Sequence, residues 1–599
     1  MKKIIYILSI LIFVAPSSWA QQDTEPRYLN PDAPITERVD DLLKRMTIEE
    51  KIGQMTQINI SVINTTGEQK DVELDADKTR EAIKKYHVGS FLNGEAVPPE
   101  QWYRYSKQLQ EIVIEESRLN IPNIYGIDHI HGASYVANST LFPQPLNLGA
   151  TFNNKLAYQM GKVTVMESAD LGHHWIFAPV LDLAMTPYWP RYWETFGESP
   201  YLAGQMGKEF INGIQTPHEE IAPYKVAATA KHFLGYSMPR SGWDRTPVYI
   251  SDQRLHELHR PSFQEAVDAG VKTIMINSGE INGVPVHASK EILTGLLRDE
   301  MGFEGVVVTD WGDIQKLYNY HNVAHNMYEA TYMAIDAGVD MSMTPTDFSF
   351  NKAMIKLVED GLITEERLDI SVRRILRLKF ELGLFENPFP RNDRLERIGS
   401  EEHQDLALQA ARESLVLLRN QDELLPLKPE KTKRLLLAGP SIDSKRNLNG
   451  GWTYSWQGAR HDSVLPERVP TIYDAIRQTY PSARIDTMHH SGEPGSKRYE
   501  QFTELAQKSD AVIIAAGEEP YTEFIGNITD LTLPKDQLDL IAAANQTGTP
   551  TALILVEGRP RVITSVADDT EAILFAGLPG FQGAQAIADV LSGAVNPSG

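Results

Sequence analysis

The chain is 599 residues long, contains no cysteine and has a formal net charge of −23. This length exceeds what one hydrophobic core usually holds, so we expect about two to four domains. The acidic balance leaves no basic face for phosphates and argues against a nucleic-acid partner. The lack of cysteine excludes disulfides, thiolate catalysis and cysteine-type zinc sites. A neutral or cationic ligand fits this composition better.

Residues 1–20 have the pattern of a secretory signal peptide. Two lysines follow Met1, an apolar run covers Ile4–Val14, and Ser18-Trp19-Ala20 supplies small residues where a signal peptidase reads the chain. We therefore expect cleavage after Ala20 and a periplasmic or secreted protein. The run is short for a membrane span, and no other segment approaches about 18 apolar residues, so we expect no membrane domain.

Short apolar runs alternate with amphipathic stretches in the region 21–385. Such alternation is typical of βαβ units with a parallel sheet, and the number of units favours a (β/α)8-like TIM barrel. The predicted strands are Val88–Leu92, Ile121–Ile127, Trp175–Leu183, Lys225–Ala230, Val271–Asn277, Val306–Thr309 and Val339–Met341.

Four of these strands end in polar or ionisable residues, namely Asp128, Lys231, Asn277 and Asp310. Parallel barrel strands all end on one rim, where barrel enzymes carry their catalytic groups, so we expect these side chains to meet there. Asp310 is the candidate nucleophile. It is followed by Trp311, and this pair suits sugar hydrolysis, because a carboxylate can attack an anomeric carbon while an indole packs on the sugar's C–H face. A helix N-cap is the alternative role for Asp310.

A proline-rich polar stretch begins at residue 386, and we assign 386–410 to a linker. A helical periodicity covers Gln404–Leu418. A second α/β series occupies 411–599, with predicted strands at Arg434–Ala438, Ala511–Ala515, Thr551–Val556 and Ala572–Phe575. This series predicts a smaller α/β sandwich with a mostly parallel sheet, whose ligand contacts lie at the carboxyl edge of the strands.

Six segments resemble motifs of glycoside hydrolase family three, the exo-acting β-glucosidases and β-glucan glucohydrolases. They are Gly126–Gly132, Pro190–Glu198, Lys231–Phe233, Val308–Trp311, Gly450–Gln457 and Gly517–Glu523, in family order. The resemblance extends from about residue 30 to the last residue. It implies a hydrolase that acts on a β-linked glucan or gluco-oligosaccharide; we expect no cofactor and no metal among the site residues, and the sequence leaves a structural metal ion open.

The resemblance also implies a retaining mechanism. Asp310 would attack the anomeric carbon and form a glycosyl-enzyme, while Glu523, from the second domain, would protonate the leaving oxygen and then activate water. This chemistry needs two carboxyl groups about 5–5.5 Å apart, one ionised and one protonated. Glu518 and Glu519 compete with Glu523 for the acid role.

Further residues carry sugar contacts by the same resemblance. Asp128 would accept hydrogen bonds from sugar hydroxyls, and the residues that would donate to them are Arg191, Lys231 and His232. Asp244 and Met275 are weaker candidates for contact with the first sugar, and Trp311 and Trp456 would clamp the next sugar between two rings. The alternatives are a buried salt bridge for Asp128 and Arg191 and core packing for the tryptophans.

The chain departs from the family's pattern in three places. The loop after Lys231–Phe233 lacks the Asp-x-His pair of the branch that cleaves N-acetylglucosamine, which argues against aminosugar substrates. Tyr188 replaces the first arginine of the family's Asp-Pro-Arg-Trp-Gly-Arg run, so the partner of that arginine, for which Asp182 is the candidate, must be satisfied otherwise. Family members usually continue beyond the position of Gly599, so we expect a longer natural protein.

Three other functions remain as alternatives. One is a catalytically silent periplasmic sugar-binding protein, and another is a β-xylosidase or xyloglucan-oligosaccharide hydrolase of the same family. The third, a nucleotide-dependent oxidoreductase, lacks its glycine fingerprint. The sequence leaves linkage preference and oligomeric state open.

Overall fold

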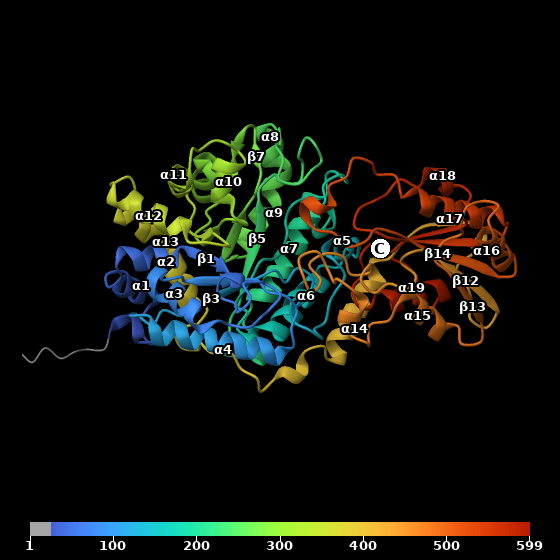
Figure 1. Cartoon of the computed structure of the whole chain (residues 1–599), viewed down its shortest axis with the longest axis horizontal. Coiled ribbons are helices and arrows are strands. Elements are labelled where there is room, and N and C mark those ends of the chain that lie inside the picture. Colours follow the sequence, from blue (N-terminus) through green and yellow to red (C-terminus); the bar gives the residue numbers. More distant parts are fainter. Residues whose placement is uncertain (1–25) are drawn as a thin grey trace, which may run out of the picture.

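The computed structural model of the chain describes residues 26–599 and consists of a larger and a smaller α/β part packed side by side (Figure 1). The predicted signal peptide lies outside the described residues. No helix within residues 26–599 is both long and apolar enough to cross a bilayer.

The larger part is an eight-stranded parallel barrel, which confirms the predicted TIM-like fold. Its strands lie in the order β10-β1-β2-β3-β4-β5-β6-β9, and every neighbouring pair is parallel. A further parallel bridge joins Val308 to Met341, the residue directly before β10, and so brings the two ends of the sheet together. The strands are β1 (Thr56–Asn59), β2 (Ser90–Leu92), β3 (Ile124–Ile127), β4 (Trp175–Ile176), β5 (Ala227–Phe233), β6 (Thr273–Ile276), β9 (Val306–Val308) and β10 (Ser342–Met343).

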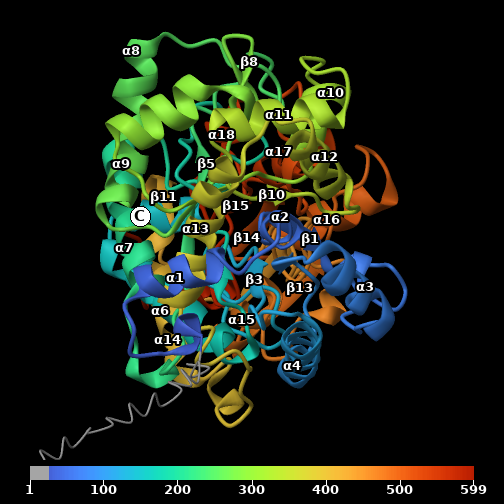
Figure 2. The ribbon, with the colours of Figure 1, turned by 90° about the vertical axis from the view of Figure 1, so that its left-hand side faces the viewer.

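Helices surround the barrel, as Figure 2 shows with this part facing the viewer. Every barrel strand is buried along its whole length, because the side chains on one face fill the barrel and those on the other pack against helices. The helices are α1 (Ile35–Leu43), α2 (Ile48–Gln54), α3 (Ala76–Tyr86), α4 (Pro99–Glu116), α5 (Pro145–Ala150), α6 (Asn154–Ser168), α7 (Pro200–Gln215), α8 (Asp252–Arg254), α9 (Arg260–Asp268), α10 (Asp313–Asn319), α11 (Met327–Ala337), α12 (Ser349–Glu359) and α13 (Glu365–Glu381).

The smaller part is a six-stranded sheet between two layers of helices, which confirms the predicted sandwich. The strand order is β11-β16-β15-β14-β12-β13, and only the β11–β16 pair is antiparallel. Helices α15 and α19 pack on one face, and α16 and α17 pack on the other. The elements are α14 (Glu401–Ser414), β11 (Val416–Asn420), β12 (Arg434–Ala438), α15 (Ile472–Thr479), β13 (Arg484–Met488), α16 (Lys497–Gln507), β14 (Ala511–Gly517), α17 (Lys535–Gln546), β15 (Thr551–Val556), α18 (Thr564–Ala567), β16 (Ala572–Phe575) and α19 (Gly583–Ser592).

Five strands have no counterpart among the predicted ones: β1, β11, β13 and the two strands β7 (Glu280–Ile281) and β8 (Val284–Pro285), which form a separate antiparallel pair. β1 reads Thr-Gln-Ile-Asn and is polar in sequence although it is fully buried, since Gln57 donates to the Ser90 hydroxyl at 2.8 Å. β11 and β13 are edge strands with polar and half-exposed residues, which weakens their pattern. The helix predicted over Gln404–Leu418 ends at Ser414, where the chain turns into β11. The segment expected as a linker, 386–410, includes most of α14.

Candidate active site

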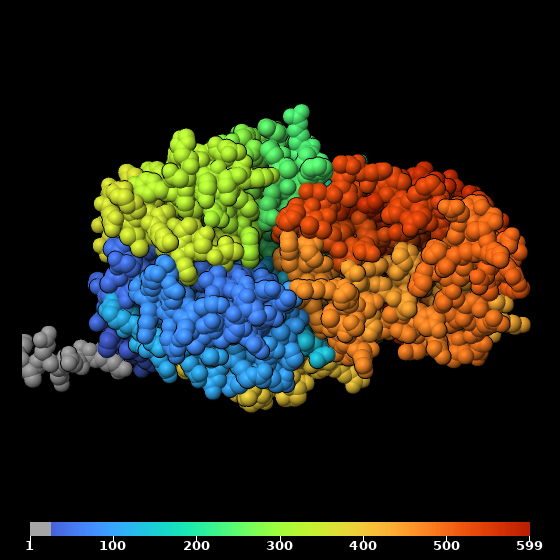
Figure 3. Space-filling view, viewed as in Figure 1, coloured from blue at the N-terminus to red at the C-terminus, as the bar shows by residue number. Residues whose placement is uncertain are grey.

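A cavity of about 800 Å³ lies between the carboxyl ends of the barrel strands and the loops of the smaller part. Figure 3 shows these two parts meeting on the face toward the viewer. The cavity brings together nine of the predicted site residues, which are Asp128, Arg191, Lys231, His232, Met275, Asp310, Trp311, Trp456 and Glu523. The tenth, Asp244, does not line it.

Asp310 lies just beyond the end of β9, with its carboxylate held on both oxygens. Oδ1 accepts from the Trp311 backbone N–H at 2.5 Å, and Oδ2 lies 2.8 Å from the Ser278 hydroxyl, whose single proton is shared with Asp313 Oδ2 at 2.6 Å. The residue at the N-cap of α10 is Gly312, so Asp310 does not occupy that position. Burial alone would raise the pKa of Asp310, but the positive charges of Arg245 and Arg191 lower it well below its usual range. The site therefore holds an ionised carboxylate, the form a nucleophile requires.

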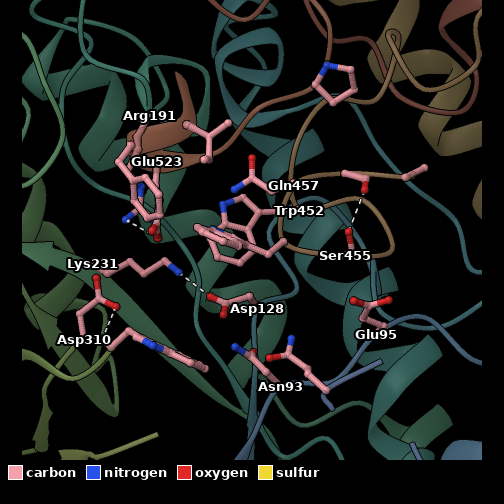
Figure 4. A pocket seen from close by; sticks show the side chains of 18 of the residues that line it. Asn93, Glu95, Asp128, Arg191, Lys231, Asp310, Trp452, Ser455, Gln457 and Glu523 are labelled. Atoms are coloured by element: carbon pink, nitrogen blue, oxygen red, sulfur yellow. Dashed lines mark hydrogen bonds and ion pairs between the residues drawn. The ribbon is translucent and has the colours of Figure 1, made fainter. Parts of the chain in front are cut away.

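Glu523 reaches the same cavity from the loop after β14. Its Oε2 accepts from Arg245 Nη1 at 2.9 Å, and its Oε1 lies 3.4 Å from Arg191 Nη1. The other guanidinium nitrogen of Arg245, Nη2, lies 3.6 Å from Asp310 Oδ2. One arginine thus contacts carboxylates from both parts of the molecule. Figure 4 shows Glu523 beside Arg191, with Asp310 at the same end of the view.

The two competing glutamates lie elsewhere. Glu518 accepts from the Tyr521 hydroxyl at 2.9 Å and pairs with Arg561 at 3.0 Å, and it does not line the cavity. Glu519 is exposed and is also absent from the cavity wall. The geometry therefore sets Glu523 apart among the three.

Asp128 and Arg191 are both ion-paired and both line the cavity. Lys231 donates to Asp128 at 2.7 Å, as the dashed line in Figure 4 marks, and Arg191 binds Glu194 through two nitrogens at 2.9 and 2.8 Å. Both residues therefore form the salt bridges that were the alternative prediction, and both also face the cavity, where a sugar could contact them. Each of the cations Arg191, Lys231 and Arg245 is paired with at least one carboxylate at the cavity.

His232 is held by Asp182 behind it. Its backbone N–H donates to Asp182 Oδ2 at 3.0 Å, and its Nδ1 is hydrogen-bonded to the same oxygen at 2.8 Å. Burial, with the charge of Arg191, lowers the pKa of His232 well below its usual value, so the ring is neutral. Nε2 is the ring nitrogen that does not contact Asp182, and whether it donates to or accepts from a sugar hydroxyl depends on the tautomer of the ring.

Asp182, the expected partner of the missing arginine, is buried with only part of its hydrogen-bonding capacity used. Burial raises the pKa of this carboxyl to about 7, and its Oδ1 has no hydrogen-bond partner among the described residues. The side chain is thus satisfied on one oxygen only, by His232.

Asp244 does not line the cavity, so the structure does not bring it together with the other predicted sugar contacts. Its Oδ1 accepts from the Tyr236 hydroxyl at 2.6 Å, and its backbone N–H donates to Asn527 Oδ1 at 2.9 Å. The neighbouring residue, Arg245, lines the cavity instead. In the sequence, the only indication of Arg245 was a cation next to the candidate residue Asp244. In the structure, Arg245 has a backbone φ of 58°, a left-handed conformation that non-glycine residues rarely adopt.

Aromatic and polar side chains line the rest of the cavity. Trp311 and Trp456 are half-buried and face it, and the Trp456 ring lies 5.5 Å from that of Phe524. Trp452 is buried, with Lys231 Nζ 5.5 Å from its ring centroid. Sequence reasoning missed several lining residues on loops after β1 and β2 and in the smaller part, which are Gln69, Asn93, Glu95, Arg446, Ser455, Gln457 and Arg460. Within residues 26–599 no group of three or more histidine or acidic side chains is arranged to hold a metal ion.

Comparison with known proteins finds relatives that are named beta-glucosidase. The chain is 42% identical over 94% of its length to lysosomal beta glucosidase of Dictyostelium discoideum, of which it covers 71%. It is 32% identical over 94% of its length to periplasmic beta-glucosidase of Salmonella typhimurium, of which it covers 73%. Other relatives at 30% identity are named beta-xylosidase.

A solved structure, the beta-glucosidase of Listeria innocua, superposes with a TM-score of 0.83 at 30% identity and covers 94% of this chain and 75% of its own. That protein has also been solved with glucose and, as a mutant, with laminaribiose. The model of the glycosyl hydrolase family 3 N-terminal domain matches residues 47–378, and that of the C-terminal domain matches 415–599. The chain therefore belongs to glycosyl hydrolase family 3.

Proposed function

We propose that this chain is a secreted, exo-acting and retaining β-glucosidase, which removes terminal β-D-glucosyl residues from β-glucans or β-linked oligosaccharides. The observation that carries the proposal is the pair of carboxylates, Asp310 and Glu523, joined by Arg245 at 3.6 and 2.9 Å in one cavity. A sugar-binding protein needs hydrogen-bonding groups and aromatic rings, but it has no need of this pair.

The two carboxyl groups divide the reaction into two steps, which start with Asp310 ionised and Glu523 protonated. Asp310 attacks the anomeric carbon and forms the glycosyl-enzyme as the bond to the leaving oxygen breaks, and Glu523 gives that oxygen its proton. Glu523 then takes a proton from water, which attacks the anomeric carbon and releases Asp310. Each displacement inverts the anomeric carbon, so glucose leaves with its β configuration retained.

Trapping the glycosyl-enzyme tests the nucleophile. A 2-deoxy-2-fluoro-β-glucoside with a good leaving group should inactivate the protein and label the peptide that contains Asp310, and Asp310→Asn should take no label. Proton NMR of a wild-type digest should show β-glucose first. Appearance of α-glucose first would refute the retaining mechanism, and no hydrolysis above the level of Asp310→Asn would favour a binding protein.

The leaving group tests the acid. Glu523→Ala should lose about 10²–10⁴-fold in kcat/KM on a poorly activated glucoside but far less on a 2,4-dinitrophenyl glucoside, which needs little protonation. Glu519→Ala is the matched control, because Glu519 is exposed and absent from the cavity wall. Equal loss on both substrates would remove Glu523 from the acid role.

A β-xylosidase is the second candidate, because several relatives carry that name. A product profile on cellobiose, laminaribiose, gentiobiose, xylobiose and a xyloglucan oligosaccharide separates the two. Release of glucose from chain ends supports the proposal, and preferential release of xylose overturns it.

A further inference from the structure

Three consecutive barrel residues contact the loop that carries the proposed acid, and this arrangement rests on the proposed function. We call Trp243–Arg245 the latch and Glu523–Ile528 the acid loop. The Trp243 indole N–H donates to the Ile528 carbonyl at 3.1 Å, the Asp244 backbone N–H donates to Asn527 Oδ1 at 2.9 Å, and Arg245 donates to Glu523 at 2.9 Å.

The acid loop has little packing of its own at its outer side. Phe524 is 49% exposed and Ile525 is 59% exposed, so neither anchors the loop in a core. From the smaller part, Arg559 donates to the Gly526 carbonyl at 2.7 Å. The backbone of Glu523 has a φ of 54°, a left-handed conformation that surrounding contacts must maintain. Contacts from the barrel are therefore needed to fix where the carboxyl group of Glu523 points.

The latch itself is braced. Thr246 donates its hydroxyl to the Trp243 carbonyl at 2.7 Å, and Ser241 accepts from the Trp243 backbone N–H at 3.0 Å. Tyr320, from the end of α10, donates to the Arg245 carbonyl at 3.2 Å. Because these hydrogen bonds fix the latch within the barrel, the latch can in turn fix the position of the acid loop.

We propose that the latch is a positioning element for the general acid/base: it holds the acid loop of the smaller part in register with the nucleophile of the barrel. Trp243 acts through the Ile528 carbonyl and Asp244 through the Asn527 side chain, and neither lines the cavity, whereas Arg245 contacts both Glu523 and Asp310. A small displacement of a catalytic group costs large factors in rate, so loosening the latch should weaken proton transfer specifically.

Two single substitutions test the latch in the full-length protein. Trp243→Phe removes the indole N–H and keeps an aromatic ring, and Asn527→Ala removes the acceptor of the Asp244 N–H. Each should lower kcat/KM on phenyl β-glucoside by about tenfold, a part of what general acid catalysis contributes, and leave 2,4-dinitrophenyl β-glucoside within about twofold of wild type. Tyr249→Phe is the matched control, since Tyr249 is 60% exposed and makes no described hydrogen bond to the acid loop.

A double-mutant cycle decides whether the latch acts through Glu523. If it does, Trp243→Phe combined with Glu523→Ala should have the same kcat/KM on phenyl β-glucoside as Glu523→Ala alone. A further drop in the double variant, or equal loss by Trp243→Phe on both glucosides, would overturn the proposal. So would wild-type rates in both single variants.

Failure of the latch is distinguishable from failure of the proposed function. If Glu523→Ala shows the leaving-group dependence of an acid and the latch variants do not, only the latch is refuted. If the wild-type protein hydrolyses neither glucoside, the proposed function is refuted and the latch with it. Should Trp243→Phe fail to fold, as judged by its melting temperature, Asn527→Ala tests the same contact region from the other part.

Discussion

Asp182→Asn should make the protein more stable at pH 8 than the wild type and change its stability little near pH 4. Burial raises the pKa of Asp182 to about 7 in the folded chain, against 3.8 for an unperturbed group. Between these values the unfolded chain has lost the proton while the folded chain retains it. The unfolded state then binds fewer protons, so the free energy of unfolding falls as pH rises from about 4 to about 7.

The size of the effect is set by the two pKa values. Each tenfold change in the protonation equilibrium is worth about 1.4 kcal/mol, so ionising Asp182 costs the wild type up to about 4 kcal/mol above pH 7. Asparagine cannot ionise, and its Oδ1 can still accept from the backbone N–H and Nδ1 of His232. The substitution therefore removes this pH-dependent cost and keeps the contacts that orient His232.

Urea unfolding followed by tryptophan fluorescence at pH 4.5 and pH 8 measures the difference between Asp182→Asn and wild type. Comparison at each pH cancels the titration of every other group. Asp539→Asn controls for the loss of one carboxylate, because Asp539 is an exposed residue on α17 that pairs with Lys535. A stability difference that is the same at both pH values would show that Asp182 ionises normally and would refute the account of its burial.

Three further outcomes are expected from the site and the barrel. Ser278→Ala removes the 2.8 Å hydrogen bond to Asp310 and should lower kcat/KM about tenfold on all substrates alike, since such a bond is worth about 1–1.5 kcal/mol; loss on poor leaving groups alone would contradict this. Arg245→Met removes a charge that lowers the pKa of Asp310, so the acid limb of the kcat/KM profile should move to higher pH, and an unmoved limb would contradict it. Lys379→Met removes the donor of three hydrogen bonds of 2.7–2.8 Å and leaves their acceptors buried without a partner. The free energy of unfolding in urea titrations should fall by about 2–4 kcal/mol, while KM stays unchanged. Wild-type stability would show that these acceptors need no partner.

The parts of the fold that the sequence predicted are those whose pattern is local. Val306–Val308 reads as a buried strand without reference to the rest of the chain, and the carboxylate that comes after it falls on the rim because barrel strands share one direction. β1 escaped prediction because its burial depends on partners such as Ser90, which satisfy polar side chains from elsewhere in the chain. The edge strands β11 and β13 were not predicted because several of their residues are exposed to water, so their sequences lack a continuous apolar run.

The same distinction holds in the site. Asp310 was predictable from its own strand, whereas the contact of Arg245 with Glu523 joins residues 278 positions apart in the chain. Nothing local to Trp243–Arg245 indicates that this segment meets a loop of the other part. The sequence therefore pointed to Asp244, whereas the neighbouring residue, Arg245, with a left-handed backbone, is the one that lines the cavity.

The distribution of charge explains why the two parts must dock before the site exists. The hydrogen bonds of Asp310 come from the barrel, through Ser278 and the backbone of Trp311. Both cations that contact Glu523, Arg191 and Arg245, also belong to the barrel, although the glutamate belongs to the smaller part. Undocking would leave two arginines without that carboxylate and the glutamate without a described cation, so the ion pairs that assemble the site also favour the docked arrangement.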